Sequence, residues 1–397
     1  MKARMAEIGD YVEAVSGPAF KSARFTDDPS DVPLIKGENI AQGYIAWEKS
    51  RYWPTGEAEE YERFGLIAGD IVLAMDRPWV TAGLKWARLK PHDPPSLLVQ
   101  RVARLRAKPG LRQDFLTYVI GSAAFSEYVR NIMSGTNVPH ISGVQIKAFK
   151  FRLPGENAQA AIASTLSAYD DLIDNNRRRI ALLEKAARLL YREWFVHFRF
   201  PGHEHVKIMG GIPEDWKRRT LVELSEVVMG QSPKSQFYND AGNGLPFHQG
   251  VSDYGFRFVS HRTYSSAATK IAEAGDILVS VRAPVGRINV TRDRIVLGRG
   301  LAAIRSRTGH QSFLLYAIKN HFYAEDIIGT GAIYAATNKK ELEGQILVEP
   351  SAVLLEEFED RANAIDLQIA CLTNQHDNLV RARDLLLPRL MNGEITV

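Results

Sequence analysis

Two stretches of the chain carry hydrophobic residues at alternating steps of four and three positions. The first stretch extends from Ile162 to Trp194 and the second from Phe358 to Leu390, and the two series lie 196 residues apart throughout. A repeat of 3.5 residues is typical of helices that pair in a coiled coil. We therefore predict two long helices that share one hydrophobic register.

The two predicted helices should pair with each other. Each would extend about 50 Å at 1.5 Å per residue, which is too long for one globular domain to cover. Because the chain would leave along one helix and return along the other, we expect an antiparallel pair. Asn176 would face Leu372 or His376 and fix the register, and we interpret His376 as a seam residue rather than a ligand. The expected seam comprises Ile162, Leu166, Ile173, Asn176, Ile180, Leu183, Leu190, Ile365, Ile369, Leu372, His376, Leu379 and Leu386.

The segments before the two helices also repeat each other. The stretch AGDIVLAMDRP at 68–78 matches AGDILVSVRAP at 274–284, and a proline, Pro154 or Pro350, precedes each helix. Short apolar runs such as DIVLAM and DILVSV indicate strands. The stretches 114–133 and 313–328 have helical spacing. Each segment therefore predicts a globule of mixed α and β structure.

The sequence thus predicts an α+β fold in the order globule, helix, globule, helix. Glycines and prolines between the first helix and the second globule indicate a linker. The expected divisions are 1–155 for the first globule, 156–202 for the central helix and linker, 203–350 for the second globule, and 351–397 for the C-terminal helix and tail.

Composition narrows the class of protein without deciding it. The 397 residues, 45% hydrophobic and 24% charged, are enough for two or three domains. The formal net charge of +4 permits nucleic-acid binding but does not require it. We expect a cytoplasmic protein without a membrane span, because no apolar run approaches about 20 residues. The single cysteine, Cys371, cannot form an internal disulfide.

Four stretches in a fixed order resemble a known family. They are GGIPEDWKRRTLVELSEVVMGQSP, PFHQGVSDYG, GDILVSVRAPVGRINV and, near the C-terminus, RARDLLLPRLMNGEI. Together with the duplicated layout, they make the chain similar to the DNA-specificity (S) subunit of type I restriction-modification systems. The resemblance extends over nearly the whole chain.

This resemblance implies that 1–155 and 203–350 are target recognition domains, each reading one half of a split DNA site. The paired helices would set the half-site spacing and dock two methyltransferase (M) subunits, to which motor-nuclease (R) subunits add. The chain itself would have no catalytic residue, metal or cofactor. The complex would use S-adenosylmethionine, ATP and Mg through the other subunits. Because the two domains differ in sequence, we expect an asymmetric site on double-stranded DNA.

Loops rich in arginine, lysine and amide side chains are the candidate DNA contacts. Such groups bind phosphates or the edges of bases, although each loop could equally be a solvated surface. Arg282 and Arg287 flank a Pro-Val-Gly turn, where their two guanidiniums could reach a groove wall or a guanine edge. The full set is Lys21, Arg24, Arg77, Lys234, Gln236, Tyr238, His248, Gln249, Arg282, Arg287, Asn338, Lys339 and Lys340.

Other classes of protein fit the sequence less well. The stretch HDPPS lacks the aromatic residue with which adenine methyltransferases stack on a flipped base. PEDWK, with Asp215 and Lys217, imitates part of a nuclease motif but has no evident partner acid on a strand. The sequence also lacks a P-loop and a cysteine–histidine cluster of zinc spacing. The alternative that stays open is a coiled-coil adaptor that binds only proteins.

Overall fold

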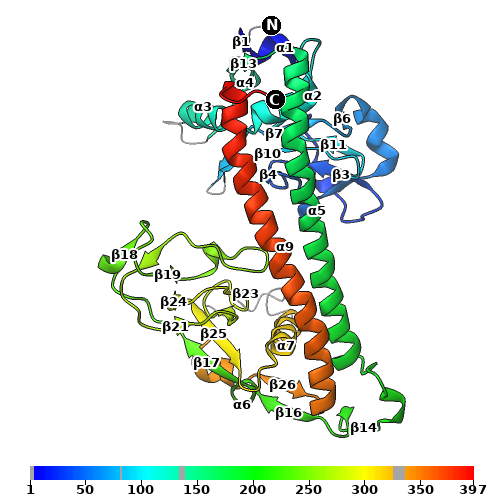
Figure 1. Ribbon diagram of the computed structural model, residues 1–397. Helices are drawn as coiled ribbons and strands as arrows, with labels where there is room; N and C mark the ends of the chain where they lie inside the picture. Colours follow the sequence, from blue (N-terminus) through cyan, green and yellow to red (C-terminus); the bar gives the residue numbers. More distant parts are fainter. Residues whose placement is uncertain (1–3, 81–82, 134–138, 325–335) are drawn as a thin grey trace. The chain divides into compact units, whose positions relative to one another are not determined.

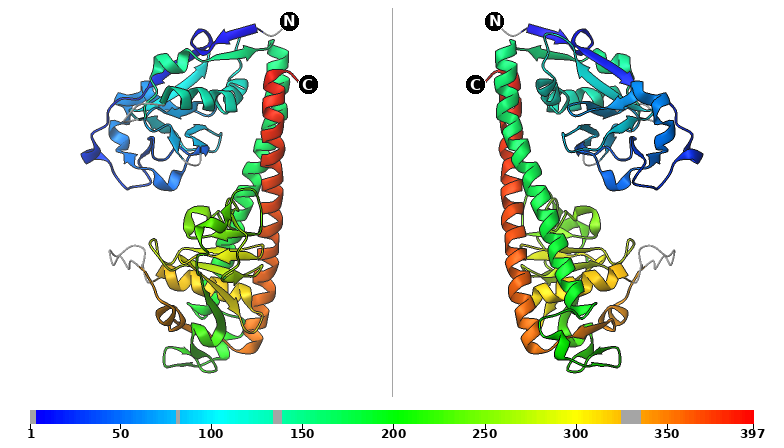
Figure 2. Two further views of the ribbon diagram at one scale, coloured as in Figure 1. Left: turned by 90° about the vertical axis from the view of Figure 1, so that its left-hand side faces the viewer. Right: turned by 90° about the vertical axis from the view of Figure 1, so that its right-hand side faces the viewer.

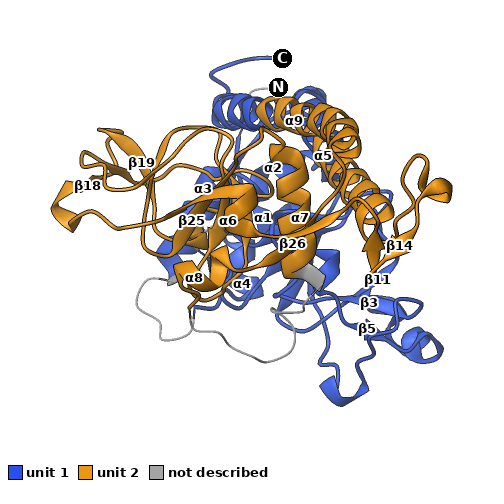
Figure 3. Ribbon diagram, turned by 90° about the horizontal axis from the view of Figure 1, so that it is seen from below, with its two compact units in different colours: residues 1–175, 376–397 blue, residues 176–375 orange. Residues whose placement is uncertain are grey.

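A computed structural model describes residues 4–80, 83–133, 139–324 and 336–397. The chain forms two compact units: residues 1–175 with 376–397, here called unit 1, and residues 176–375, called unit 2 (Figure 3). Both are mixed α/β structures, and each contains parts of two long helices, α5 (Glu156–Phe195) and α9 (Ala352–Asn392) (Figure 1).

Unit 1 is built on two main sheets, with strand orders β2-β12-β7-β10-β4 and β5-β3-β11-β6. The first has β2 (Val12–Ser16), β12 (Val102–Ala107), β7 (Ile71–Ala74), β10 (Trp86–Arg88) and β4 (Gln42–Gly43). The second has β5 (Tyr52–Trp53), β3 (Val32–Ile35), β11 (Ser96–Leu98) and β6 (Gly65–Leu66). All four residues of β7 are buried, which explains why this strand is continuously apolar.

Smaller elements complete unit 1. The strands β1 (Arg4–Glu7) and β13 (Lys150–Leu153) pair antiparallel, as do β8 (Trp79–Val80) and β9 (Gly83–Leu84). The helices are α1 (Ile8–Tyr11), α2 (Gln113–Ile120), α3 (Ala123–Met133) and α4 (Gly143–Lys147), with 3-10 turns η1 (Ser22–Arg24), η2 (Trp47–Lys49) and η3 (Thr55–Phe64).

The helical stretch expected at 114–133 is two helices rather than one. It breaks at Gly121, between α2 and α3. A Cβ atom at Gly121 would lie 2.5 Å from Cζ2 of Trp86 on β10, so the chain approaches the sheet too closely here for any other residue. The break itself has a local reason, because Gly121 ends α2 and Oγ of Ser122 accepts from the backbone N–H of Phe125, at 3.1 Å, at the start of α3.

Unit 2 has the sheet orders β17-β25-β22-β23 and β18-β20-β19-β24-β21, which repeat those of unit 1 apart from the edge strands β4 and β18. The first sheet has β17 (Ser225–Met229), β25 (Leu301–Ser306), β22 (Ile277–Ser280) and β23 (Ile288–Val290). The second has β18 (Tyr238–Asn239), β20 (Tyr264–Ser265), β19 (Leu245–His248), β24 (Ile295–Leu297) and β21 (Ile271–Ala272).

Some of the smaller elements of unit 2 also have counterparts in unit 1. The strands β16 (Lys217–Thr220) and β26 (Ile346–Glu349) pair antiparallel, as β1 and β13 do. The helices are α6 (Leu221–Leu224), α7 (Gln311–Ala324) and α8 (Lys339–Glu343). The remaining elements are β14 (Ile208–Met209), β15 (Ile212–Pro213), η4 (His203–His205), η5 (Ser235–Phe237) and η6 (Val251–Asp253). Of the helical stretch expected at 313–328, residues 325–328 lie outside the described residues.

Individual side-chain contacts recur in both units as well. Arg106 donates to both carboxylate oxygens of Asp70, at 2.5 and 2.8 Å. Arg305 binds Asp276 in the same way, at 2.7 and 2.8 Å. Each pair links the equivalent strand, β12 or β25, to the turn before β7 or β22. The internal repeat of the sequence is therefore a repeat of structure.

The long helices lie against each other within each unit (Figure 2). In unit 1, Ile162 near the start of α5 belongs to the same buried cluster as Leu390 near the end of α9. In unit 2, Ile180 packs in one cluster with Ile369 and Leu372. All expected seam residues are buried or half-buried, whereas Arg177, Arg178 and Arg179 are exposed.

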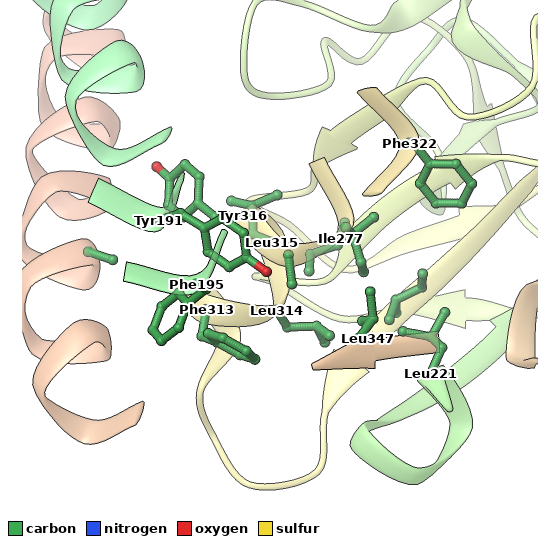
Figure 4. Close-up of a cluster of buried hydrophobic side chains, with 14 of the residues drawn as sticks. Tyr191, Phe195, Leu221, Ile277, Phe313, Leu314, Leu315, Tyr316, Phe322 and Leu347 are labelled. Carbon is green, nitrogen blue, oxygen red and sulfur yellow. The ribbon is translucent and has the colours of Figure 1, made fainter. Parts of the chain in front are cut away.

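The core of unit 2 joins its globule to the helices (Figure 4). The ring of Phe195 on α5 packs edge-to-face against Phe313 of α7 at 5.2 Å and against Phe358 of α9 at 5.0 Å. Such aromatic pairs contribute about 0.5–1.5 kcal/mol each beyond the burial of their area. The sheet, α7 and both helix segments of unit 2 therefore form one packed body.

Within the described residues, none of the helices combines the length and the apolar character that crossing a membrane requires.

Candidate nucleic-acid interface

Three loops of unit 2 meet around a cavity of ≈ 210 Å³. Gln249 follows β19, Arg282 follows β22, and Arg299 lies between β24 and β25, and all three are exposed. We call this cavity the arginine pocket, and it is lined by Gln249, Gly250, Val251, Ser280, Arg282, Ala283, Arg299 and Gly300.

Main-chain hydrogen bonds hold the three loops together. The backbone N–H of Gly300 donates to the carbonyl oxygen of Gln249 at 3.2 Å, and the N–H of Val281 donates to that of Gly300 at 2.9 Å. A Cβ atom at Gly300 would overlap the Gln249 carbonyl oxygen, so this junction requires glycine. The polar side chains therefore project from a fixed backbone.

Two further candidate loops adjoin the arginine pocket. The backbone N–H of Arg299 donates to Oγ of Ser232, at 3.2 Å, in the loop that also carries Lys234 and Gln236. Arg282 forms an isolated β-bridge with Ala336, two residues before Asn338. Guanidinium and amide groups are those that bind guanine and adenine edges in the major groove. The pocket therefore has the chemistry of a base-reading site.

The equivalent position of unit 1 carries different side chains. Asp76 follows β7 as Arg282 follows β22, and Asp76 forms the corresponding β-bridge with His140. Its carboxylate accepts from Nδ1 of His140 at 2.6 Å and binds Nη1 of Arg101 at 2.8 Å. Burial opposes ionisation, but these two partners hold the pKa of Asp76 below its ordinary value. At this equivalent position, unit 1 therefore has an aspartate paired with basic side chains, whereas unit 2 has arginines.

The remaining candidates of unit 1 lie at the surface. Lys21 is exposed and precedes η1. Arg24 forms an ion pair with Glu57 and lies 5.2 Å from the centroid of the Trp53 ring, so its guanidinium is already engaged. Arg77 is exposed, with a φ of 43°, and its backbone N–H donates to Pro139 at 2.8 Å.

In unit 2, Lys234, Gln236, Lys339 and Lys340 are exposed. Two other candidates have structural contacts. The Tyr238 ring stacks on Phe247 at 4.6 Å, and its hydroxyl donates to the Pro233 carbonyl oxygen. Asn338 caps α8, because its side chain accepts from the backbone N–H of Glu341 at 3.0 Å.

His248 differs from the expectation of a surface contact, because its side chain is fully buried. Its Nδ1 lies 3.1 Å from Asp253 and its Nε2 lies 2.9 Å from Nδ1 of His261. Burial lowers the pKa of His248, and Asp253 works in the opposite direction. We therefore remove His248 from the candidate interface and assign it to the support of the neighbouring Gln249.

Arg287 is exposed but does not line the arginine pocket, although Arg282 does. The hairpin between β22 and β23 separates the two side chains, and Arg287 lines a second cavity beside α5. The two arginines thus line different cavities, and the contact of each with DNA stays a prediction. Arg299, conversely, was not among the residues predicted from the sequence. The feature that indicates it is a Gly-Arg-Gly stretch between two apolar runs.

Within the described residues, no group of three or more histidine, cysteine, aspartate or glutamate side chains has an arrangement that could hold a metal ion.

Comparisons with known proteins agree with this architecture. Residues 2–185 match the family model described as "Type I restriction modification DNA specificity domain". Over these residues the chain is therefore similar to the DNA specificity domain of type I restriction-modification systems. It is 28% identical over 404 aligned residues to the putative type I restriction enzyme MjaX specificity subunit of Methanocaldococcus jannaschii, covering 98% of this chain and 93% of the relative.

Two further similarities concern the sequence of another relative and the fold of a solved structure. The chain is 24% identical to the type I restriction enzyme MjaIX specificity subunit of the same organism, over 73% of this chain and 71% of the relative. Its fold is similar to the crystal structure of the type I restriction-modification system S subunit from M. genitalium. That similarity has a TM-score of 0.60 at 16% identity and covers 98% of this chain and 96% of that one.

Proposed function

We propose that the chain recognises a bipartite, asymmetric DNA site for a type I restriction-modification complex, and that each globule reads one half of the site. The target recognition domains would be 1–155 and 203–350. One observation carries this proposal: equivalent positions in the two units hold Arg282 in one and Asp76 in the other. Two similar folds that carry different side chains at equivalent positions are suited to two different half-sites.

The proposal assigns the role of spacer to α5 and α9, paired as an antiparallel coiled coil. The packing of Ile180 with Ile369 and Leu372 supports this role. Two half-sites on one face of B-DNA must lie about one helical turn, roughly 34 Å, or a multiple of it apart. A rigid helical spacer would therefore determine which half-site separations are accepted.

The other subunits of the complex would dock on the helices. Several leucines on α5 and α9 are more than half exposed, among them Leu182, Leu367 and Leu385. Exposed apolar residues on a long helix favour partner binding. We propose that two methyltransferase subunits bind here, with motor-nuclease subunits in the full cytoplasmic complex, and that S-adenosylmethionine, ATP and Mg act through those subunits.

Methylome sequencing tests the proposal directly. Cells with and without the gene would be compared, in the presence of a gene for the methyltransferase subunit. The expected result is one split motif with a methylated adenine in each half, present only with the gene. An unchanged methylome, together with DNA binding that lacks sequence selectivity, would favour the protein-binding adaptor instead.

A further inference from the structure

Unit 2 contains a second, larger cavity of ≈ 440 Å³ beside α5. Its walls come from α5, α7 and the hairpin between β22 and β23. We call it the helix-side cavity, and it is lined by Ala181, Glu184, Lys185, Arg188, Phe256, Gly286, Arg287, Ile288, Lys319 and Phe322. None of these residues belongs to the arginine pocket.

Positive charge dominates the lining. Four basic side chains meet a single carboxylate, that of Glu184. Both oxygens of Glu184 are already bound, Oε1 by Arg257 at 2.6 Å and Oε2 by Lys319 at 2.9 Å. Over the described part of the chain, Lys185 and Arg287 form no ion pair. The cavity therefore has an excess of positive charge that an anion would neutralise.

Apolar groups form the rest of the wall. Phe256 is 71% exposed, and Ile288 and Phe322 line the cavity beside it. A large exposed aromatic side chain next to uncompensated cations is typical of a binding surface. A sugar–phosphate backbone has this combination of properties, because charged phosphates alternate with the less polar deoxyribose rings.

The hairpin connects the helix-side cavity to the arginine pocket. Arg282 and Arg287 stand at the two ends of one short turn, in which Oγ of Ser280 accepts from the backbone N–H of Arg287 at 2.8 Å. The N–H of Gly286 donates to the Ser280 carbonyl oxygen at 2.9 Å. Because the turn is fixed in this way, a duplex whose base edges face Arg282 would bring its backbone near Arg287.

We propose that the helix-side cavity binds backbone phosphates of duplex DNA beside the second half-site, without reading sequence. The inference rests on the proposed function, because it needs DNA to approach unit 2. It assigns Lys185 and Arg287 to phosphate contacts, which position the protein and supply salt-dependent affinity. Base discrimination stays with the arginine pocket.

The test uses the chain in complex with its methyltransferase partner. Binding would be measured across a salt series for two duplexes, one with the methylated motif and one of scrambled sequence. The test variant is Lys185→Gln with Arg287→Gln. The matched control is Arg178→Gln with Arg179→Gln, which removes two exposed charges from α5 outside the cavity.

Loss of two phosphate contacts should reduce the slope of log affinity against log salt by about two. The test variant should weaken binding to both duplexes by the same factor and leave their affinity ratio unchanged, and the control should match the wild type.

A wild-type slope in a folded test variant would overturn the inference, as would a changed affinity ratio. Loss of methyltransferase co-purification with an unchanged slope would also overturn it, because the cavity would then bind an acidic protein surface. If the wild type fails to separate the two duplexes, the proposed function itself is wrong.

Discussion

At the scale of single residues, Arg299 carries the most specific chemical expectation. Its backbone is held by Ser232, and its exposed side chain shares the arginine pocket with Gln249 and Arg282. A guanidinium that donates two hydrogen bonds to guanine contributes about 1–3 kcal/mol of discrimination against a wrong base. A fixed backbone lowers the entropy cost of such a contact, so Arg299 is suited to bind a base rather than a phosphate.

The first prediction is that Arg299→Ala relaxes recognition at one position of the second half-site. Affinity for the motif should fall by about 1–3 kcal/mol, whereas affinity for a scrambled duplex should change far less. The measurement is binding to a panel of duplexes with single base changes in that half-site. Arg294→Ala is the control, because Arg294 is also exposed but pairs with Glu273 outside the pocket. An equal loss on every duplex would contradict a base contact.

His248 carries a different expectation, which concerns pH. Burial lowers its pKa in the folded chain, so the unfolded chain binds a proton at higher pH than the folded chain does. The unfolded state therefore holds more protons below about pH 6.5. The free energy of unfolding must then fall as the pH decreases through this range, by up to about 1.4 kcal/mol per pH unit for this one group.

The second prediction follows for His248→Gln. This variant should be less stable than the wild type at neutral pH, because it loses contacts to Asp253 and His261. Its free energy of unfolding should nevertheless depend less on pH between 7 and 5.5. Denaturant unfolding at several pH values measures both quantities. Parallel curves for the two proteins would show that His248 does not titrate in this way.

At the scale of elements, a buried ionic network holds the globule of unit 2 onto its helices. Arg257, which is 4% exposed, donates to Glu184 of α5 at 2.6 Å and also binds Asp366 of α9. Tyr316 of α7 donates to the same Asp366 at 2.7 Å. Burial disfavours the charged guanidinium, but the two carboxylates hold the pKa of Arg257 above its ordinary value.

Unit 1 has a counterpart of this network. Tyr118 of α2 donates to Asp170 of α5 at 2.8 Å, and Asp170 also binds Arg383 of α9 at 2.8 Å. Burial, followed by the charge of Asp170, raises the pKa of the Tyr118 hydroxyl, which therefore stays a donor at neutral pH. Both units thus use a tyrosine–aspartate pair to fix the globule at one angle on the helix segments.

The third prediction is that Arg257→Met destabilises the chain strongly. Removing one partner of a buried ionic network costs about 3–5 kcal/mol, here because Asp366 loses its cation and Glu184 keeps only Lys319. Combining Arg257→Met with Asp366→Asn should recover part of this loss, since one unpaired charge is removed as well. Denaturant unfolding measures both variants, and Arg294→Met serves as the exposed control. A loss below about 1 kcal/mol in Arg257→Met would fit a surface ion pair instead.

The sequence predicted the long helices well because a heptad seam is visible in local spacing alone. Leu166 and Ile369 are fully buried at positions that the spacing marks. The break between α2 and α3 has local signals of another kind, Gly121 at the end of α2 and Ser122, whose Oγ accepts from the backbone N–H of Phe125 at 3.1 Å. Periodicity thus predicts where helical structure forms, whereas capping residues mark where it is interrupted.

The candidate site was predictable only at the level of loops. Spacing identified the loops of Gln249 and Arg282, but the directions of side chains depend on the folded hairpin, which sends Arg287 into another cavity. The burial of His248 depends on the loop that brings His261 beside it. Residue type therefore indicated suitable chemistry, whereas exposure and grouping required the structure.

At the scale of the whole molecule, duplication explains how one chain could read two unrelated half-sites. Both the strand arrangement and single side-chain contacts recur in the two units. Arg106 binds Asp70 in a bidentate pair, as Arg305 binds Asp276, and these pairs keep the strands of each unit in the same register. The loops that follow these strands differ, because unit 1 has Asp76 at the position where unit 2 has Arg282. Under the proposed function, stability and specificity would depend on different residues, so that one half would change its target without unfolding.

The last prediction is that replacing 1–155 by the corresponding segment of a relative alters only one half of the methylated motif. The junction lies just before α5, so both long helices stay intact. Several contacts cross it, among them the hydrogen bond from Tyr118 to Asp170 and the one from Nε2 of Gln159 to the Gly110 carbonyl oxygen at 3.1 Å. A donor segment with tyrosine at the position of Tyr118 should therefore dock on α5, and Tyr118→Phe in the parent chain controls for loss of that bond.

Methylome sequencing should show one new half-site, one unchanged half-site and the original spacing, because the second globule and the helices are the same. A change in both half-sites would mean that the two domains do not read DNA independently.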